Sequence, residues 1–341
     1  MTTRIAINGF GRIGRCVLRA LYENGYRQDM EVVAINELAD IESVSYMLRY
    51  DSTHGRFNGT VSIADEQHLM VNGDRIRMCH TGDPAELDWA ALDVDLVLEC
   101  SGQIRSREDA ELHLSRGAKK VLISNPADSA VDNTIIYGHN HNSLATDQRI
   151  VSNGSCSTNA LIPVLTLIDQ AYGIEAGVTT TIHSAMNDQP VIDAYHSDLR
   201  RTRSSVQSII PVDTGLPAGI ERLMPQLAGK IESLHVRVPT INVSALDITL
   251  QLNKETDTDA VNQLLATGAG QAFDGILGLT REAHASIDFN HDPRSAIVDA
   301  TQTRVSGGRL LKLLVWFDNE WGFANRMLDT ASEMVDVSGR Q

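Results

Sequence analysis

The stretch RIAINGFGRIGR, residues 4–15, joins a short apolar run to a glycine-rich turn and then to the start of a helical pattern. Apolar residues then recur at helical spacing, at Ile13, Cys16, Val17, Ala20 and Leu21. A second apolar run, EVVAIN at 31–36, follows at the distance that a βαβ crossover needs. These residues therefore predict strand, turn, helix and parallel strand.

The pattern continues through the first 155 residues. The runs DLVLECSG (95–102) and KKVLISNP (119–126) end in small or turn residues, and a helical stretch at 106–116 separates them. Apolar strands that alternate with helices are typical of an α/β fold. We therefore expect residues 1–155 to form a doubly wound (Rossmann) parallel sheet.

The pattern changes after residue 156. A helix predicted at 159–172 is followed by long β-rich stretches, which favour an α+β domain with a mixed or antiparallel sheet over residues 156–319. Helical spacing returns from residue 320 towards the end, and we expect this helix to pack back on the first domain. Between His183 and Thr214 lies a long irregular tract, which could cover a cofactor or meet a partner subunit.

The glycines of the first turn form a GxGxxG pattern, with Gly9, Gly11 and Gly14 placed where a strand ends and a helix begins. Bare amides at a helix N-terminus can face a pyrophosphate, although a tight structural turn would need similar glycines. Glu37 lies 23 residues after Gly14, where its carboxylate can accept hydrogen bonds from an adenosine ribose. Because Glu37 and Asp40 would repel a 2'-phosphate, NAD is predicted rather than NADP.

Composition limits the remaining possibilities. The 341 residues suit two domains, and a formal net charge of −15 disfavours nucleic acid as a partner. The N-terminus lacks the pattern of a secretory signal, and no run approaches the ~18 apolar residues of a membrane span. The four cysteines lack CxxC pairing. We expect a soluble, cytoplasmic protein with reduced thiols, no membrane contact and no metal.

One cysteine stands in a setting suited to chemistry. In VSNGSCSTNALIP (151–163), Cys156 follows a predicted strand and precedes a helix, whose dipole would lower the thiol pKa. A buried structural role suits Cys16 and Cys100 better, because both lie in apolar stretches. His183, at the end of TTTIHS (179–184), is the candidate base, although a lone histidine is more often structural.

Five motifs together resemble those of the glyceraldehyde-3-phosphate dehydrogenase family. They occur in that family's order and span nearly the whole chain: INGFGRIGR (7–15), SNGSCSTN (152–159), TIHSAMNDQ (181–189), HVRVPTINVS (235–244) and WFDNEWGFANR (316–326). The resemblance implies that Cys156 attacks an aldehyde, that His183 takes its proton, and that hydride passes to NAD to leave a thioester.

The resemblance also implies further site residues. Asn319 matches the position that holds the nicotinamide carboxamide, and Arg12 and Ile13 match the dinucleotide turn. The positions that match contacts to substrate or phosphate are Ser155, Ser157, Arg201, Thr214, Gly215 and Arg237. Each of these arginines could instead form a surface ion pair. The resemblance finally implies a homotetramer, in which residues 188–211 lie against a neighbouring subunit.

Within the family, HSAMNDQPVIDAYHSDLRRTR (183–203) and IIPVDTG (209–215) look like a branch that oxidises erythrose 4-phosphate. Met186 stands where glycolytic members usually carry a threonine whose hydroxyl helps to bind phosphate. Its loss should favour release of the acyl group by water, giving 4-phosphoerythronate, an acid on the route to pyridoxal phosphate. HTGD (80–83) also lacks a basic residue that relatives carry near the adenine.

Two alternatives remain. The nearest is a phosphorylating glyceraldehyde-3-phosphate dehydrogenase of glycolysis, which would need nearly every residue named above. The other is a catalytically retired relative that acts as an interaction or RNA-binding module. The presence of Cys156, His183 and Asn319, and the net charge of −15, argue against the retired protein.

Overall fold

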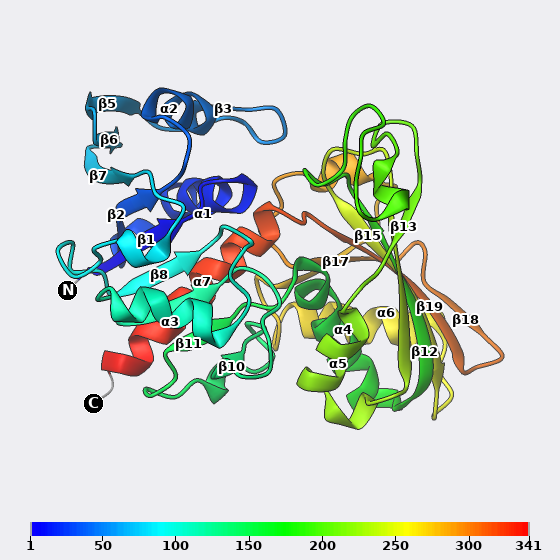
Figure 1. Ribbon diagram of the computed structural model, residues 1–341. Helices are drawn as coiled ribbons and strands as arrows, with labels where there is room; N and C mark the ends of the chain where they lie inside the picture. Colours follow the sequence, from blue (N-terminus) through cyan, green and yellow to red (C-terminus); the bar gives the residue numbers. More distant parts are fainter. Residues whose placement is uncertain (1, 340–341) are drawn as a thin grey trace. The chain divides into compact units, whose positions relative to one another are not determined.

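The computed structural model describes residues 2–339 and divides into two compact units (Figure 1). The first unit comprises Met1–Ser155 with Phe323–Gln341, and the second comprises Cys156–Gly322. Each unit is built around its own sheet. No helix of the described residues is long and apolar enough to cross a membrane, and no disulfide joins the four cysteines, all of which are described.

The sheet of the first unit has nine strands in the order β10-β11-β9-β8-β1-β2-β7-β6-β5. All strand pairs from β10 to β7 are parallel, which confirms the predicted Rossmann sheet. The chain leaves β1 for β2 on one side and later returns to β8 on the other, so a topological switch point lies beside β1. The strands are β1 (Thr3–Asn8), β2 (Met30–Asn36), β5 (Val61–Asp65), β6 (His68–Val71), β7 (Asp74–Cys79), β8 (Leu96–Glu99), β9 (Lys120–Ile123), β10 (Asn133–Thr134) and β11 (Ile150–Ser152).

The antiparallel end of this sheet, β5 to β7, was not predicted. Asn72 and Gly73 join β6 to β7, and both have positive φ values, of 51° and 95°. Two successive positive φ values make the type I′ turn that Asn-Gly favours in two-residue hairpins. The dipeptide between the apolar residues of β6 and β7 was therefore a usable signal in the sequence.

Four helices pack on the first unit's sheet: α1 (Arg12–Glu23), α2 (Ile41–Arg49), α3 (Arg107–Ser115) and, from Phe323 onward, α7 (Trp321–Gly339). The α3 helix begins where Ser106 accepts a hydrogen bond from the amide of Asp109, as expected of a serine N-cap. The α7 helix is tied to the unit by Lys120, whose Nζ donates to the carbonyl of Met334 at 2.6 Å. The final helix thus packs on the sheet of the first unit.

The sheet of the second unit has the order β13-β14-β12-β15-β19-β17-β16, with β18 paired to β19. Its β12–β14 and β16–β17 pairs are parallel and the others antiparallel, as expected of the predicted mixed sheet. The strands are β12 (Ile174–His183), β13 (Ile210–Val212), β14 (Ile231–Arg237), β15 (Ser244–Leu252), β16 (Leu277–Thr280), β17 (Ala296–Asp299), β18 (Arg304–Ser306) and β19 (Leu310–Phe317).

Three helices accompany this sheet: α4 (Cys156–Tyr172), α5 (Leu216–Leu223) and α6 (Thr258–Ala269). The α4 helix packs against β12 and β15 and starts three residues before the predicted Asn159, so Cys156 is its first residue. The tract after His183 is largely irregular, as predicted, but it contains a 3₁₀ turn at Leu199–Thr202 and the unpredicted β13. The remaining elements are the hairpin β3 (Tyr50–Asp51) and β4 (Gly55–Arg56) and five further 3₁₀ turns: Tyr26–Gln28, Pro84–Glu86, His141–Ser143, Pro225–Leu227 and Ser286–Phe289.

Candidate active site

Each of the three glycines of the first turn has a different structural role. Gly9 has φ +86°, and a Cβ there would lie 2.5 Å from the backbone of Ser101, at the end of the neighbouring β8. A Cβ on Gly14 would lie 2.3 Å from the carbonyl oxygen of Gly9, so this glycine lets α1 start close to the turn. Gly11 has no atom within 4 Å of such a Cβ, which leaves its backbone open to a ligand. Gly11 is also the N-cap of α1, and no side chain caps its amides.

A cavity of about 390 Å³ lies at the carboxyl ends of β1, β2, β7 and β8, where ligands bind in open α/β sheets. It is lined by Asn8, Gly9, Gly11, Asn36, Glu37, Leu38, Thr81, Gly82, Pro84, Cys100, Ser101, Gln103 and Ile104. Two residues of the HTGD segment are among them. The glycine turn and this cavity together fit a dinucleotide diphosphate and its adenosine.

Glu37 follows β2 directly and lines that cavity. Its Oε2 accepts a hydrogen bond from the amide of Phe10 at 2.9 Å, and its Oε1 accepts one from the amide of Leu38 at 2.8 Å. The carboxylate is thereby held against the glycine turn. Each carboxylate oxygen can accept a further hydrogen bond, so the residue can still bind a ribose diol.

Arg12 and Ile13 form the first turn of α1. The Arg12 guanidinium forms an ion pair with Asp51 through two hydrogen bonds, so its direction is set within the first unit. Burial alone would raise the pKa of Asp51, but the hydrogen bonds and charge of Arg12 lower it. Ile13 is half-buried. Both residues lie at the helix start to which the sequence assigned them.

A buried hydrogen-bond network adjoins the same cavity and was not predicted from the sequence. Glu99 is fully buried at the end of β8, and it accepts hydrogen bonds from the Asn8 amide, the Ser101 amide and hydroxyl, and Nε2 of His113. Trp89 donates to Nδ1 of His113 at 3.0 Å. Because Trp can only donate, the His113 proton lies on Nε2, and this neutral ring helps to satisfy a buried carboxylate.

The network reaches the cavity through two asparagines. Asn36 donates to Oδ1 of Asn8 at 2.7 Å, and Asn8 and Asn36 both line the cavity. Asn8 and Asn36 also end the neighbouring strands β1 and β2, where they are partners in the strand register. The network thus joins the floor of the cavity to three strand ends.

Cys156 and His183 come together within the second unit. Cys156 is the first residue of α4 and His183 is the last of β12, and the distance from Sγ to Nε2 of His183 is 3.7 Å. Nδ1 of His183 lies 2.8 Å from the carbonyl oxygen of Ser184. A carbonyl only accepts, so Nδ1 carries the proton, and the lone pair of a neutral His183 faces the thiol.

Ionisation of this pair is governed by burial. Burial raises the pKa of the Cys156 thiol to about 11, against the opposing effect of hydrogen bonds from Ser157. Burial also lowers the pKa of His183, and the hydrogen bond to Ser184 opposes it. The expected lowering of the thiol pKa by the helix start is not met, because desolvation outweighs it. Thiol and imidazole are therefore both neutral at pH 7.

Two serines that were not predicted from the sequence hydrogen-bond Asn319, and one of them, Ser184, directly follows His183 in the chain. Oδ1 of Asn319 accepts hydrogen bonds from the hydroxyls of Ser184, at 3.0 Å, and Ser244, at 2.8 Å. The Ser244 hydroxyl itself accepts the amide of Ser184 at 3.1 Å, so its proton points to Asn319. These contacts anchor the amide oxygen of Asn319 and direct its NH₂ group away from the serines.

Two predicted arginines share one carboxylate. Asp188 accepts two hydrogen bonds from Arg237, at 2.6 and 3.1 Å, and one from Arg201 at 2.9 Å. Burial would raise the pKa of Asp188, but Arg237 and then Arg201 lower it. Arg201 also forms an ion pair with Asp198, at 3.3 Å, so the two guanidinium groups face two carboxylates. The register partner of His183 is Arg237, which brings this cluster beside the candidate base. Asp188 was not predicted as part of the site.

The other predicted substrate positions lie near helix starts. Ser157 is buried in the first turn of α4, and Ser155 precedes that helix as the last residue of the first unit's main segment. Thr214 and Gly215 precede α5, where Oγ1 of Thr214 accepts the amide of Leu216 at 3.2 Å. Met186 is 44% exposed, in the loop after His183.

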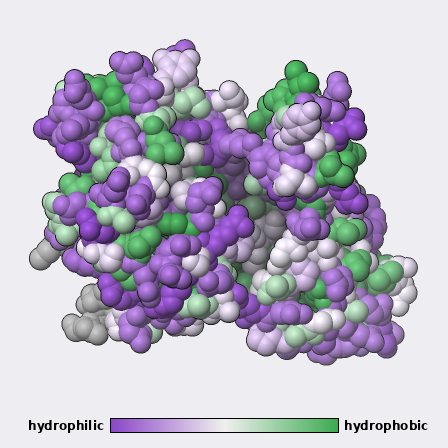
Figure 2. Space-filling view, viewed as in Figure 1, coloured by the Kyte–Doolittle hydropathy of each residue, from purple (hydrophilic) through white to green (hydrophobic). Residues whose placement is uncertain are grey.

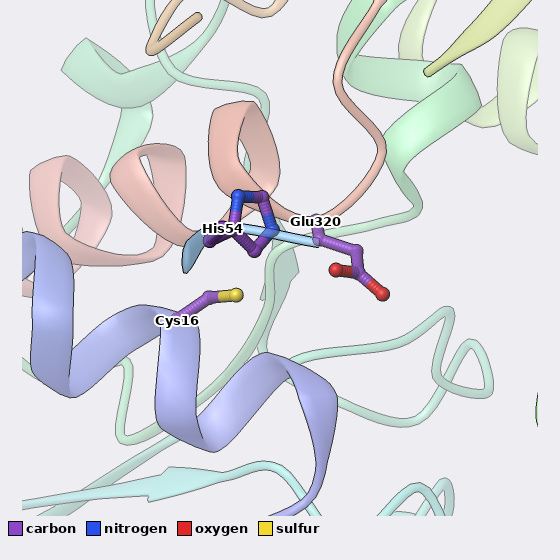
Figure 3. A group of neighbouring side chains, drawn as sticks. All are labelled: Cys16, His54 and Glu320. Atoms are coloured by element: carbon purple, nitrogen blue, oxygen red, sulfur yellow. The ribbon is translucent and has the colours of Figure 1, made fainter. Parts of the chain in front are cut away.

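Two possible metal ligands lie close together in the first unit. Cys16 on α1 and His54 in the turn between β3 and β4 bring their ligand atoms within 4.8 Å of each other in the first unit (Figure 3). The third side chain drawn there, Glu320, belongs to the second unit. Two ligands from one unit do not close a structural site, so we assign no metal, and the absence of one remains a prediction.

The family comparison agrees with this geometry. Residues 3–107 match the NAD binding domain of glyceraldehyde 3-phosphate dehydrogenase, and residues 155–319 match the C-terminal domain of glyceraldehyde 3-phosphate dehydrogenase. Together these matches cover most of the chain, which therefore belongs to the glyceraldehyde-3-phosphate dehydrogenase family. The chain is thus an NAD-dependent dehydrogenase of that family, and the prediction of NAD as its cofactor is confirmed.

Proposed function

We propose that the chain is a D-erythrose-4-phosphate dehydrogenase. It oxidises D-erythrose 4-phosphate to 4-phospho-D-erythronate through a thioester on Cys156, which water releases. The observation that carries the chemistry is the approach of Cys156 to His183, with Sγ and Nε2 at 3.7 Å. The observation that favours this substrate is Met186, which offers no hydroxyl where a second phosphate would need one.

His183 acts as the base that makes the nucleophile. Nε2 takes the thiol proton as Sγ of Cys156 bonds to the aldehyde carbon, because a thiol with a pKa of about 11 is hardly ionised on its own. The imidazolium formed then donates a hydrogen bond to the developing oxyanion. NAD supplies the hydride acceptor. The oxyanion collapses to a carbonyl as the hydride leaves the carbon, a thioester remains on Cys156, and the His183 imidazolium then releases to solvent the proton it took from the thiol.

The dinucleotide is held by residues whose geometry fits it. Gly11 leaves room for the diphosphate at the start of α1, beside Gly9, Arg12, Ile13 and Gly14, and Glu37 accepts from the ribose. Asn319 presents its NH₂ group to the carboxamide of the nicotinamide. Residues 1–155 act as the NAD-binding domain with the final helix packed on it, and residues 156–319 carry the chemistry.

The substrate phosphate meets the positive charge of Arg201 and Arg237, with donors from Thr214 and Gly215. Ser155 and Ser157 lie on either side of the nucleophile in the chain. These residues together hold one anion, the phosphate group of the substrate. Because Met186 removes a donor from the second subsite, a free phosphate ion is poorly positioned, and His183 activates water instead.

A phosphorylating glyceraldehyde-3-phosphate dehydrogenase is the second candidate, because both matched domain models carry that enzyme's name. Steady-state assays on both aldehydes, with and without inorganic phosphate, separate the two. We expect NADH from erythrose 4-phosphate in phosphate-free buffer and 4-phosphoerythronate as product. An acyl phosphate, or a rate that rises steeply with phosphate, would favour the glycolytic enzyme.

We further propose a cytoplasmic homotetramer that supplies an acid for pyridoxal phosphate synthesis. Residues 188–211 would lie against a neighbouring subunit, since this tract exposes several large apolar side chains: Val191, Ile192, Tyr195, Leu199, Val206 and Ile209. Figure 2 shows hydrophobic side chains at the upper right, over this tract. Sedimentation that gave a fully active monomer would contradict this assembly.

A further inference from the structure

The strand register places a second histidine directly behind the proposed base. The parallel strands β12 and β14 pair His183 with Arg237 and Thr181 with His235. Side chains two residues apart point to the same face of a sheet, so His235 lies diagonally next to His183 on the face that carries the site. The two rings stack with centroids 5.1 Å apart and an interplanar angle of 24°.

We propose that His235 is a positioning residue, whose stacked ring holds the His183 imidazole in the orientation and the neutral form that accept the Cys156 proton. This inference rests on the proposed role of His183 as base. His235 touches neither Sγ nor the reacting carbon in this arrangement. It acts through the ring of His183.

The orientation of His183 is set from three sides. The carbonyl of Ser184 accepts from Nδ1 and fixes the tautomer, and the ring of Phe317 on β19 meets His183 edge-on at 6.4 Å. These contacts leave one face of the His183 imidazole ring open, and the stacked ring of His235 covers that face. A ring that cannot tilt keeps Nε2 aimed at Sγ of Cys156.

The stack also keeps charge and water away from His183. Burial, followed by the charges of His183 and Arg237, lowers the pKa of His235 to about 3, so His235 stays neutral in the working range. A neutral ring of this size removes water from one face of His183, which favours the unprotonated base. His235 does not compete for the Cys156 proton.

Other groups also act on the ionisation of His183. Arg237 on β14 lowers its pKa, whereas Glu320 after β19 and Asp188 after β12 raise it. Cys156 faces it from α4, neutral as described above. The effects of these charged groups on the pKa of His183 partly cancel. Removal of the neutral His235 ring should therefore change that pKa mainly by letting water reach His183.

The test is the pH profile of thioester formation, measured as the first turnover of NADH in the full enzyme. In His235→Ala, water replaces the ring and the pKa of His183 rises, so more base is protonated at low pH. We expect the acidic limb to move up by about 0.5 to 1 pH unit, which lowers the rate by about 3- to 10-fold at pH values below the pKa of His183, with KM little changed. His235→Phe keeps a stacked ring and should restore the profile.

Ser233→Ala is the matched control, because Ser233 lies two residues earlier on the same face of β14 and hydrogen-bonds Thr179 at 2.9 Å. It should leave the profile unchanged. If His235→Ala does not fold, His235→Asn has a smaller side chain without a stacking ring, leaves room for water and should show the same shift. An unchanged limb in the folded variant, or an equal shift in Ser233→Ala, overturns the role of His235. If His183→Asn is itself harmless, the base assignment fails instead.

Discussion

Replacement of His183 by Asn should slow thioester formation. The size of the loss depends on how much of Cys156 is ionised without a base. With a thiol pKa of about 11, only about one molecule in three thousand carries a thiolate at pH 7.5. Without Nε2 to take the proton, this fraction alone can attack the aldehyde. The expected loss is therefore ~10³-fold, inside the range usual for a positioned base.

The pH dependence makes this prediction specific. In the variant, the rate should rise about tenfold for each pH unit between 7 and 10, because the thiolate fraction does so. The native enzyme should change far less, since its unprotonated base is already present above the lowered pKa of His183. The deficit caused by the missing base should therefore shrink as the pH rises.

Rapid-mixing measurements of the first NADH turnover give the rate, and NAD affinity serves as the control because the residues proposed to hold the diphosphate and the ribose belong to the first unit. A deficit of the same size at pH 7 and pH 10 would refute the reasoning. It would mean that His183 contributes a hydrogen bond but no proton transfer. A variant with the native rate would remove His183 from the mechanism altogether.

Three further predictions follow from the same geometry. Cys156→Ser should abolish turnover while NAD affinity stays within about twofold, and appreciable turnover would contradict the thioester. Glu37→Ala should lower the preference for NAD over NADP by about tenfold, whereas Glu37→Gln should lose the repulsion but keep an acceptor for the Phe10 amide; an unchanged preference in both would contradict the ribose contact. Met186→Thr should raise the share of acyl phosphate formed at high phosphate concentration, and a product mixture identical to that of the native enzyme would separate Met186 from the choice of nucleophile.

Local pattern was sufficient for several features of the site. The glycine turn and Glu37 each depend on residues close together in the chain, where strand, turn and helix signals can be recognised. The α4 helix was also predicted locally, although it starts three residues earlier than expected, at Cys156. The Asn72–Gly73 hairpin was equally local. It lies at the end of a sheet whose other strands are parallel, so the strand–helix alternation that indicates the rest of the sheet does not extend to it.

The sequence also indicated both domains, because apolar period and element order persist over long stretches and do not depend on exact contacts. The ionisation of Cys156 could not be predicted from the sequence. A helix start predicts a lowered thiol pKa, but the opposite result depends on how completely the surrounding chain removes water from the sulfur.

By itself, then, the sequence determined the class of each domain and the dinucleotide turn, since these follow from residue type and short-range spacing, and its resemblance to a family indicated Cys156 and His183 as the candidate pair. Only the tertiary structure decided that Asp188 joins Arg201 to Arg237, that Ser184 and Ser244 orient Asn319, and that Glu99 supports the nucleotide cavity. It alone also decided that His235 stacks on His183. That contact joins residues 52 positions apart through the register of β12 and β14, and a shift of one residue would turn the His235 side chain to the opposite face.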